Sequence, residues 1–247
     1  MKEINIIQRL GNKTNDIKYF KHLFPINYEI IVEPFGGSFA VSKYLYDNTK
    51  QFHINDLDNE LFYIYKNFNK YVVIRDEIRQ IHKNYNTKFK DGFNSFFEEI
   101  KKNNYDEHIY NYIIKTNIMR GYCIRFPKSL TYNKTEINLL NTAIITNNDY
   151  TKIFNQYKDN ENAFIFLDPP YMFSDNSGYI PQTQDTDATK ILINILEFIK
   201  NAKCKVMLVI NKLEIIKYLF KDFHKIDYLI TYQMSKKKSF HSVYCNY

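Results

Sequence analysis

The sequence has little cysteine and no recognisable metal-binding pattern. Its 247 residues contain only three cysteines, Cys123, Cys204 and Cys245, which lie far apart. This spacing argues against a disulfide framework or a zinc cluster and suits a reducing compartment, so the cysteines are interpreted as packing residues. The six histidines show no metal-ligand spacing either, and His241 is interpreted as structural. No metal site is therefore expected.

Signals for export and for membrane insertion are also missing. The N-terminal residues MKEINIIQRLGNK lack the long apolar core and the small-residue cleavage site of a signal peptide. No apolar run approaches the length of a membrane span. We therefore expect a soluble protein of the cytoplasm, or of the host cytoplasm if the chain is viral.

The chain has no tryptophan but is rich in other aromatic residues and in lysine. A net charge of +7 and a pI near 9.0 favour a polyanionic partner such as a nucleic acid. A codon bias towards lysine explains the same charge equally well. The hydrophobic content of 45% is that of a globular protein, and the length fits one domain or one domain with an insertion.

Short apolar runs predict buried strands at residues 29–32, 164–167 and 205–210. Each run ends at polar or turn-forming residues. Helical patterns follow at 40–46, 188–201 and 213–221. Alternating strands and helices predict an α/β sheet, in which ligands bind beyond the carboxyl ends of the strands.

The middle of the chain differs from both ends. Residues 59–142 are polar, aromatic and helical in pattern, with no convincing buried strand. We interpret this stretch as an inserted helical module. It includes a basic loop at 117–135, where Arg120, Arg125 and Lys128 stand among aromatic residues and are candidates for nucleic-acid contact.

Glycine and proline are scarce, with six of each, so their clusters are informative. Two prolines stand together in Asp168-Pro169-Pro170-Tyr171, directly after a predicted strand. Prolines lack an N–H and fix φ, so this turn would be stiff and would present a carboxylate beside an unpaired carbonyl. Two such acceptors suit an amino group on a base, with Tyr171 as a stacking surface. An ordinary turn is the alternative interpretation.

Two glycines stand together in Glu33-Pro34-Phe35-Gly36-Gly37-Ser38, where a strand turns into a helix. Glycine allows unusual φ values and a close approach to a ligand. The stretch matches neither the dinucleotide fingerprint nor the phosphate-binding loop. Asp56 follows at the tip of a possible second strand, a position that suits a ribose hydroxyl. A helix N-cap is an equally good role for Asp56 and does not exclude the first.

Taken together, these residues resemble the Dam-like, D12-class N6-adenine DNA methyltransferases, which use S-adenosylmethionine. The order of the motifs is similar: Leu10-Gly11-Asn12-Lys13, the glycine loop, an insertion, and Asp-Pro-Pro-Tyr. Phe39 stands where the family's loop usually has its final glycine. The resemblance implies cofactor binding by Gly11, Lys13, Glu33, Pro34, Phe35, Gly36, Gly37, Ser38, Asp56, Asp149, Tyr150 and Asp168.

The resemblance also implies a fold and a reaction. The fold would be a Rossmann-like class I methyltransferase sheet formed by 1–58 and 143–247, with 59–142 as an inserted helical DNA target-recognition domain. The reaction would be site-specific methylation of a flipped-out adenine in duplex DNA, within or outside a restriction-modification system. Catalysis would fall to Asp168, Pro169, Pro170 and Tyr171, and DNA binding to Arg120, Arg125, Lys128, Lys236, Lys237 and Lys238.

Several alternatives stay open. The lysine run 236–238 would clamp phosphates, but charge runs are commonly exposed turns. The acceptor pair would serve RNA adenine or cytosine N4 as well. A DNA-binding homologue without catalysis is a further alternative. A monomer or weak homodimer is expected, and a cognate restriction endonuclease would be a second partner.

Overall fold

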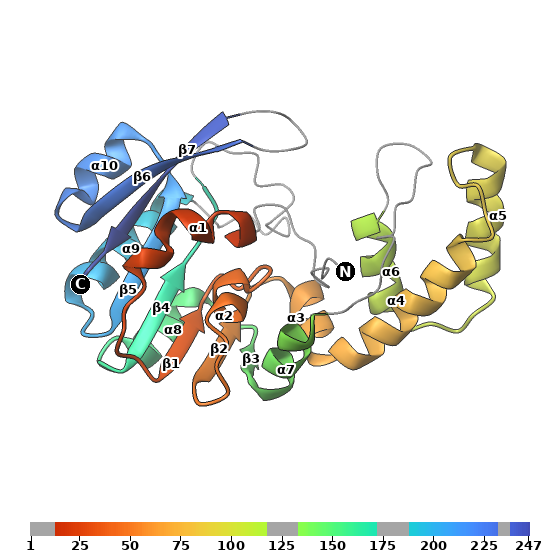
Figure 1. The fold of residues 1–247 in the computed structure, drawn as a ribbon, viewed down its shortest axis with the longest axis horizontal. Coiled ribbons are helices and arrows are strands. Elements are labelled where there is room, and N and C mark those ends of the chain that lie inside the picture. Colours follow the sequence, from red (N-terminus) through yellow and green to blue (C-terminus); the bar gives the residue numbers. More distant parts are fainter. Residues whose placement is uncertain (1–12, 118–132, 172–187, 232–237) are drawn as a thin grey trace. The chain divides into compact units, whose positions relative to one another are not determined.

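The computed structural model describes residues 13–117, 133–171, 188–231 and 238–247. Contacts divide the chain into two compact units (Figure 1). One contains Glu60–Asn141, and the other contains the described residues up to Asn59 together with Thr142–Tyr247. In the part of the chain that the structure describes, no helix has the length and apolarity to cross a bilayer.

The unit that contains Thr142–Tyr247 is built on one seven-stranded sheet with the order β3-β2-β1-β4-β5-β7-β6. The first five strands are parallel, and β7 runs antiparallel to both β5 and β6. This is the predicted Rossmann-like arrangement. The strands are β1 (Ile30–Glu33), β2 (Gln51–Asn55), β3 (Ile144–Thr146), β4 (Ala163–Leu167), β5 (Lys205–Asn211), β6 (His224–Thr231) and β7 (Lys238–Cys245).

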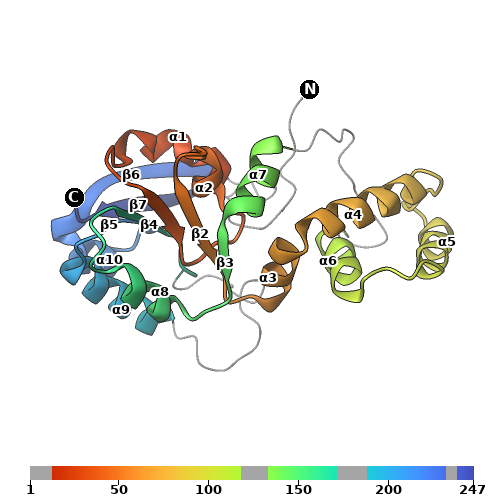
Figure 2. The ribbon, with the colours of Figure 1, turned by 90° about the horizontal axis from the view of Figure 1, so that it is seen from below.

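Helices cover both faces of the sheet (Figure 2). Along β4, Ala163, Ile165 and Leu167 join the core beneath the helices of one face. Phe164 and Phe166 point the other way, where Phe166 stacks on Phe20 at 6.0 Å. Because both faces are covered, the strand reads as one continuous apolar run. One face carries α8 (Tyr150–Tyr157), α9 (Ala188–Asn201) and α10 (Glu214–Leu219), and the other carries α1 (Ile17–Phe20) and α2 (Ala40–Tyr44). Short 3-10 turns lie at Lys13–Asn15, Lys21–Leu23 and Lys221–Phe223, the last directly after α10.

The predicted elements are confirmed with small shifts at their ends. The predicted strands differ from β1 by one residue at each end and from β4 and β5 by one residue at one end, and α9 matches 188–201. The helices predicted at 40–46 and 213–221 are shorter than expected. The sequence did not predict β7, β3, which has only three residues, or β6, whose exposed and buried residues alternate along an edge strand.

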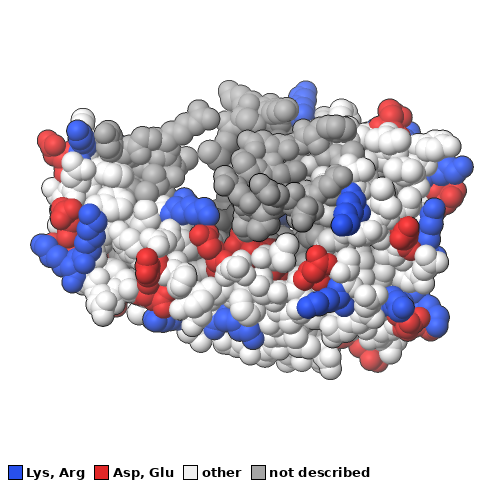
Figure 3. All heavy atoms as spheres, turned by 180° about the vertical axis from the view of Figure 1, so that it is seen from behind, with Lys and Arg blue, Asp and Glu red and all other residues white. Residues whose placement is uncertain are grey.

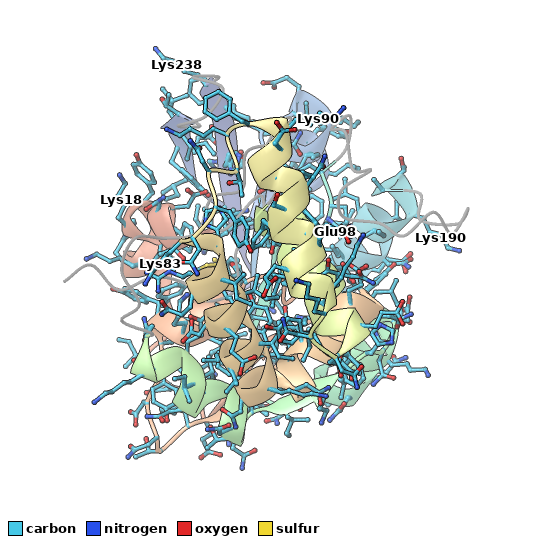
Figure 4. All side chains as sticks on the ribbon, turned by 90° about the vertical axis from the view of Figure 1, so that its right-hand side faces the viewer. Lys18, Lys83, Lys90, Glu98, Lys190 and Lys238 are labelled. Carbon is cyan, nitrogen blue, oxygen red and sulfur yellow. The ribbon has the colours of Figure 1, made fainter. Side chains whose placement is uncertain are left out.

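The described residues of the other unit form helices and no strand, as the sequence predicts. Tyr71 and Tyr112 meet in its core at 5.9 Å, and Phe96 is fully buried. Figure 4 faces this unit, with Lys90 and Glu98 on the outside of α5. Its helices are α3 (Asn59–Lys66), α4 (Phe68–His82), α5 (Lys90–Lys101), α6 (Glu107–Asn117) and α7 (Lys134–Thr142).

Candidate active site

Four of the predicted motifs follow parallel strands at the same edge of the sheet. The glycine loop follows β1, Asp56 follows β2, Asp149 and Tyr150 follow β3, and Asp168 follows β4. The strand order reverses between β1 and β4, which are neighbours. Such a reversal leaves a crevice at the carboxyl edge, where open α/β sheets bind their ligands.

The two glycines of the loop have different physical roles. The Gly36 N–H donates to the Asn55 carbonyl at 2.7 Å, and a Cβ on Gly36 would lie 2.8 Å from Ile54 Cγ2. Gly36 is therefore required by close packing on β2. Gly37 has a φ of +51°, and a Cβ there would meet nothing within 4 Å. Gly37 thus borders open space.

Phe39, which stands where the family pattern usually has a glycine, adopts a backbone conformation that is rare for residues with a side chain. Its φ and ψ are 41° and 43°, in the left-handed region that glycine adopts readily. The side chain is fully buried, with Lys43 Nζ 5.9 Å from its ring centre. The ring therefore belongs to the core, and the backbone strain is offset by burial.

Polar side chains at the end of β2 hold the loop in place. Asp56 Oδ2 accepts a hydrogen bond from the Gly37 N–H at 2.8 Å, and its Oδ1 accepts from the Asp58 N–H at 3.0 Å. Asp56 therefore contacts the loop and also forms the turn that precedes α3. Because α3 begins at Asn59, Asp56 is not its N-cap residue, and the contact of Asp56 with a ribose hydroxyl stays a prediction.

Asn55 is a site residue to which sequence reasoning gave no role. Its side chain is 1% exposed. The Nδ2 donates to the carbonyls of Pro34 and Asn148, each at 2.9 Å, and Oδ1 accepts from the Asn148 N–H at 2.8 Å. Asn55 thereby joins the loops after β1 and β3. The sequence signal that could have identified Asn55 is its position directly before Asp56, at the end of a predicted strand.

Glu33 and Ser38 are buried, and Glu33 binds the helix that follows the loop. Its Oε1 accepts a hydrogen bond from the Ser42 N–H at 2.6 Å, in the first turn of α2. Burial raises the pKa of Glu33 to about 7, although hydrogen bonds from Ser42 oppose the shift. The carboxyl group holds the start of α2.

Two aromatic rings flank the loop on the side of β3. The Phe35 and Tyr150 ring centres are 5.3 Å apart with an interplanar angle of 31°. The Tyr150 hydroxyl accepts a hydrogen bond from Asn194 Nδ2 at 2.8 Å, which fixes the ring against α9. Asp149 is the N-cap of α8 and accepts from the Thr151 N–H at 2.9 Å.

Asp168 lies at the centre of a compact group with Lys13 and Tyr171. Lys13 Nζ donates to Asp168 Oδ2 at 2.7 Å, and the Tyr171 hydroxyl donates to Oδ1 at 3.1 Å. Lys13 Nζ also lies 5.3 Å from the centre of the Tyr171 ring. The sequence led us to expect a carboxylate and a carbonyl held by prolines. The structure adds a lysine and a hydroxyl that hold the carboxylate.

Burial shapes the ionisation of this group. Lys13 is only 4% exposed. Burial by itself lowers the pKa of Lys13, but Asp168, Tyr228 and Asp16 together outweigh it, so the pKa is raised. Burial raises the pKa of Asp168, and Lys13 opposes that shift. Lys13 therefore stays protonated and provides the counter-charge for Asp168.

Most of the other residues singled out from the sequence lie outside this site or outside the described residues. Lys238 is exposed at the start of β7, and Cys204 and Cys245 are buried. Among the residues that the structure describes, no group of three His, Cys, Asp or Glu side chains is arranged to hold a metal ion. Six candidate residues and one cysteine lie outside the described residues: Gly11, Arg120, Arg125, Lys128, Lys236, Lys237 and Cys123.

Comparison with known proteins identifies the family. The model of the D12 class N6 adenine-specific DNA methyltransferases matches residues 10–234. The chain belongs to this family. The Type II methyltransferase M.CviBI of Paramecium bursaria Chlorella virus NC1A is 24% identical over 244 residues, covering 90% of this chain and 88% of that protein.

A solved structure of the hMettl16 catalytic domain in complex with the MAT2A 3'UTR hairpin 6 matches with a TM-score of 0.40 and 10% identity. It covers 100% of this chain and 75% of that chain.

Membership of the D12 class makes the chain a methyltransferase and its sheet a Rossmann-like methyltransferase sheet. The family implies S-adenosylmethionine as the methyl donor. The crevice residues suit that molecule chemically, because Gly37 borders open space beside a pair of aromatic rings and a carboxylate. Aromatic faces suit an adenine ring, and a carboxylate suits ribose hydroxyls.

Glu33→Gln should make stability less dependent on pH. A carboxyl group whose pKa rises on folding, here to about 7, stabilises the fold at low pH and loses that contribution as the pH rises through 7. The shift corresponds to at most about 3 kcal/mol. The melting temperature of the parent protein should therefore fall more between pH 5.5 and pH 8 than that of Glu33→Gln. Exposed Glu161→Gln is the control, and equal pH slopes for parent and Glu33→Gln would refute the role of Glu33.

Phe39→Gly should destabilise the protein less than removal of an equally buried ring from ordinary backbone. Glycine relieves about 1–2 kcal/mol of left-handed strain, whereas loss of a buried phenylalanine costs about 3–5 kcal/mol. Phe220→Gly is the matched variant, because Phe220 is also fully buried but has a φ of −106°. Urea denaturation measures both. An equal or larger loss for Phe39→Gly would contradict the strain argument.

Proposed function

We propose that the chain transfers a methyl group from S-adenosylmethionine to N6 of an adenine at a specific sequence of duplex DNA. The observation that carries this proposal is the Asp168 carboxylate, held by Lys13 and Tyr171 at the end of β4 and next to the strand that leads into the glycine loop. Membership of the adenine-specific family supports the choice of base and of nucleic acid.

The chain's own residues would hold the cofactor at the crevice. The backbone at Gly37 leaves room for a ligand, Phe35 and Tyr150 offer ring faces, and Asp56 offers carboxylate oxygens. Each carboxylate oxygen of Asp56 can accept a further hydrogen bond. When bound, S-adenosylmethionine supplies an electrophilic methyl group. The first motif would contribute Lys13, with Gly11 outside the described residues.

Asp168 and Tyr171 would act on the substrate base. The amino group of adenine is a poor nucleophile because its lone pair is delocalised into the ring. A carboxylate that accepts its N–H favours a geometry in which the lone pair is available, and Asp168 can then receive the released proton. The Pro169 carbonyl would be the second acceptor. The base would stack on Tyr171 after flipping out of the duplex, which costs a few kcal/mol.

The helical unit would recognise the target, with the boundaries predicted above. Lysine and arginine contacts to phosphates make binding sensitive to salt. Figure 3 shows basic and acidic side chains interspersed on one face of the molecule. The DNA-binding roles of Arg120, Arg125, Lys128 and the lysines at 236–238 stay predictions.

Asp168→Ala should nearly abolish methyl transfer and leave binding of DNA largely intact. Loss of the acceptor should lower the rate by about 10²–10⁴-fold. The assay is incubation with labelled S-adenosylmethionine and duplex DNA, followed by nucleoside analysis for N6-methyladenine. RNA and cytosine are measured in parallel, and methyl transfer by the parent protein only to those substrates would overturn the proposed function.

The same substitution removes the carboxylate that buried Lys13 contacts at 2.7 Å, which costs up to about 3–5 kcal/mol of stability. The double variant Asp168→Ala/Lys13→Met removes both charges and should recover part of the stability but none of the activity. Asp159→Ala, at an exposed ion pair with Lys203, is the control. Parental activity in folded Asp168→Ala would rule out the acceptor mechanism.

Gly37→Ala should weaken cofactor binding more than it weakens the fold. The added methyl meets no protein atom within 4 Å but lies where the cofactor is proposed to bind. Left-handed strain should cost about 1–2 kcal/mol of stability. Calorimetric titration should show at least a tenfold loss of affinity for S-adenosylmethionine. Unchanged affinity would place the cofactor elsewhere, whereas Gly36→Ala should chiefly lower stability through its clash with Ile54.

A further inference from the structure

A second layer of buried polar side chains lies behind Lys13 and Tyr171. It consists of Asp16 at the start of α1, Tyr228 on β6 and His241 on β7, which are 7%, 6% and 1% exposed. Figure 1 shows α1 beside the β6–β7 hairpin. None of the motifs considered above includes these residues. Polar groups are costly to bury without partners, so their common location needs an explanation.

The Asp16 side chain does not cap the helix that it precedes. It is the N-cap residue of α1, where an aspartate normally accepts a backbone N–H of the first turn. Its side chain makes no such bond. Its Oδ2 instead lies 3.5 Å from the Tyr228 hydroxyl and 3.9 Å from His241 Nδ1. The carboxylate also interacts with Lys13 and contributes to the raised pKa of that lysine.

Asp16 is also tied to Lys13 through the backbone. The Asp16 N–H donates to the Lys13 carbonyl at 2.8 Å. The charged groups that act on Asp16 are Lys13, Lys18 and Asp168, and the Tyr228 hydroxyl faces it from β6. The protonated Lys13 therefore interacts with two carboxylates, one that faces the substrate side and one behind it.

His241 connects this layer to Tyr171. Its ring centre lies 5.3 Å from that of Tyr171 with an interplanar angle of 89°, an edge-to-face contact. Nδ1 lies 3.3 Å from the Tyr228 hydroxyl. Burial, aided by Lys13, lowers the pKa of His241 to about 3. The imidazole is therefore neutral, and no second positive charge is placed near Lys13.

The Tyr171 ring is consequently held on three sides. Its hydroxyl binds Asp168, Lys13 lies over the ring, and His241 meets it edge to face. The register of β7 sets the third contact, because His241 pairs with Asn211 of β5 and with Tyr228 of β6. A shift by one residue would turn His241 to the opposite face of the sheet.

We propose that Asp16, Tyr228 and His241 are positioning residues for methyl transfer, with Asp16 and Tyr228 holding Lys13 and His241 holding the Tyr171 ring. The proposal rests on the proposed function for its catalytic meaning. These residues do not touch the substrate. They limit the positions of the lysine and the ring that do.

The first test removes the hydroxyl group of Tyr228. Tyr228→Phe keeps the ring that stacks on Tyr19 at 5.1 Å and loses only the hydroxyl. Because misplacement of reacting groups by about 1 Å can cost about 10²-fold, we expect kcat to fall about tenfold, with KM values for DNA and cofactor within about twofold. Tyr218→Phe is the control, since Tyr218 is 71% exposed. A parental kcat in folded Tyr228→Phe would overturn the role of this hydroxyl.

The second test separates position from packing at His241. His241→Phe keeps an aromatic ring beside Tyr171, whereas His241→Leu keeps apolar bulk without a ring. We expect a lower kcat for His241→Leu than for His241→Phe, whichever of the two variants has the lower melting temperature. If activity simply follows the melting temperature of the two variants, His241 is structural only.

An NMR measurement, which does not depend on catalysis, tests the positioning of Tyr171 separately from the proposed function. The aromatic NMR signals of Tyr171, identified by their loss in Tyr171→Phe, should shift in His241→Leu and stay in place in Tyr218→Phe. Unshifted signals would overturn the positioning of Tyr171 even in an active enzyme. Failure of the parent protein to methylate DNA would overturn the proposed function, and the NMR result would still report on the contact.

Discussion

Lys13 and Asp168 are 155 residues apart in the sequence, and their 2.7 Å ion pair joins the N-terminal segment to the end of β4. Removing two charges from water costs several kcal/mol per ion, and only close, well-oriented partners recover that free energy. The pair therefore requires the 3-10 turn at Lys13, the end of β4 and the Tyr171 ring to adopt one arrangement. The position of the group that would meet the substrate depends on this constraint.

The cofactor side of the crevice is held by different means. The glycine loop has few side chains of its own to fix it, and neighbouring strands supply the contacts. Asn55 and Asp56 at the end of β2 bind the carbonyl of Pro34 and the N–H of Gly37, and Glu33 binds the start of α2. These bonds exist in the protein itself, so a ligand need not order the loop when it binds.

The parts of this site that the sequence predicts are those encoded in short stretches. A continuous apolar run followed by Asp-Pro-Pro-Tyr locates β4 and its corner, and helical spacing locates α9. The contacts of Lys13, Asn55 and His241 could not be predicted in this way, because their partners come from distant segments whose register is set by the whole sheet. The residue type at Phe39 gave no sign of its left-handed backbone, and the available signal was the glycine that the family pattern usually has at this position.

The net charge is a poor guide to a DNA-binding surface, because it does not show which cationic side chains are buried or paired. Four cationic side chains in the described residues are buried: Lys13, Lys43, Arg75 and Arg79. Lys13 neutralises a carboxylate, and neither buried arginine of α4 is exposed to a phosphate. Exposed lysines such as Lys70, Lys101 and Lys115 are paired with acidic residues. Affinity for a polyanion depends on the cations that can release phosphate counterions, so these buried and paired cations contribute little to it, and the formal charge of +7 does not by itself locate a DNA-binding surface.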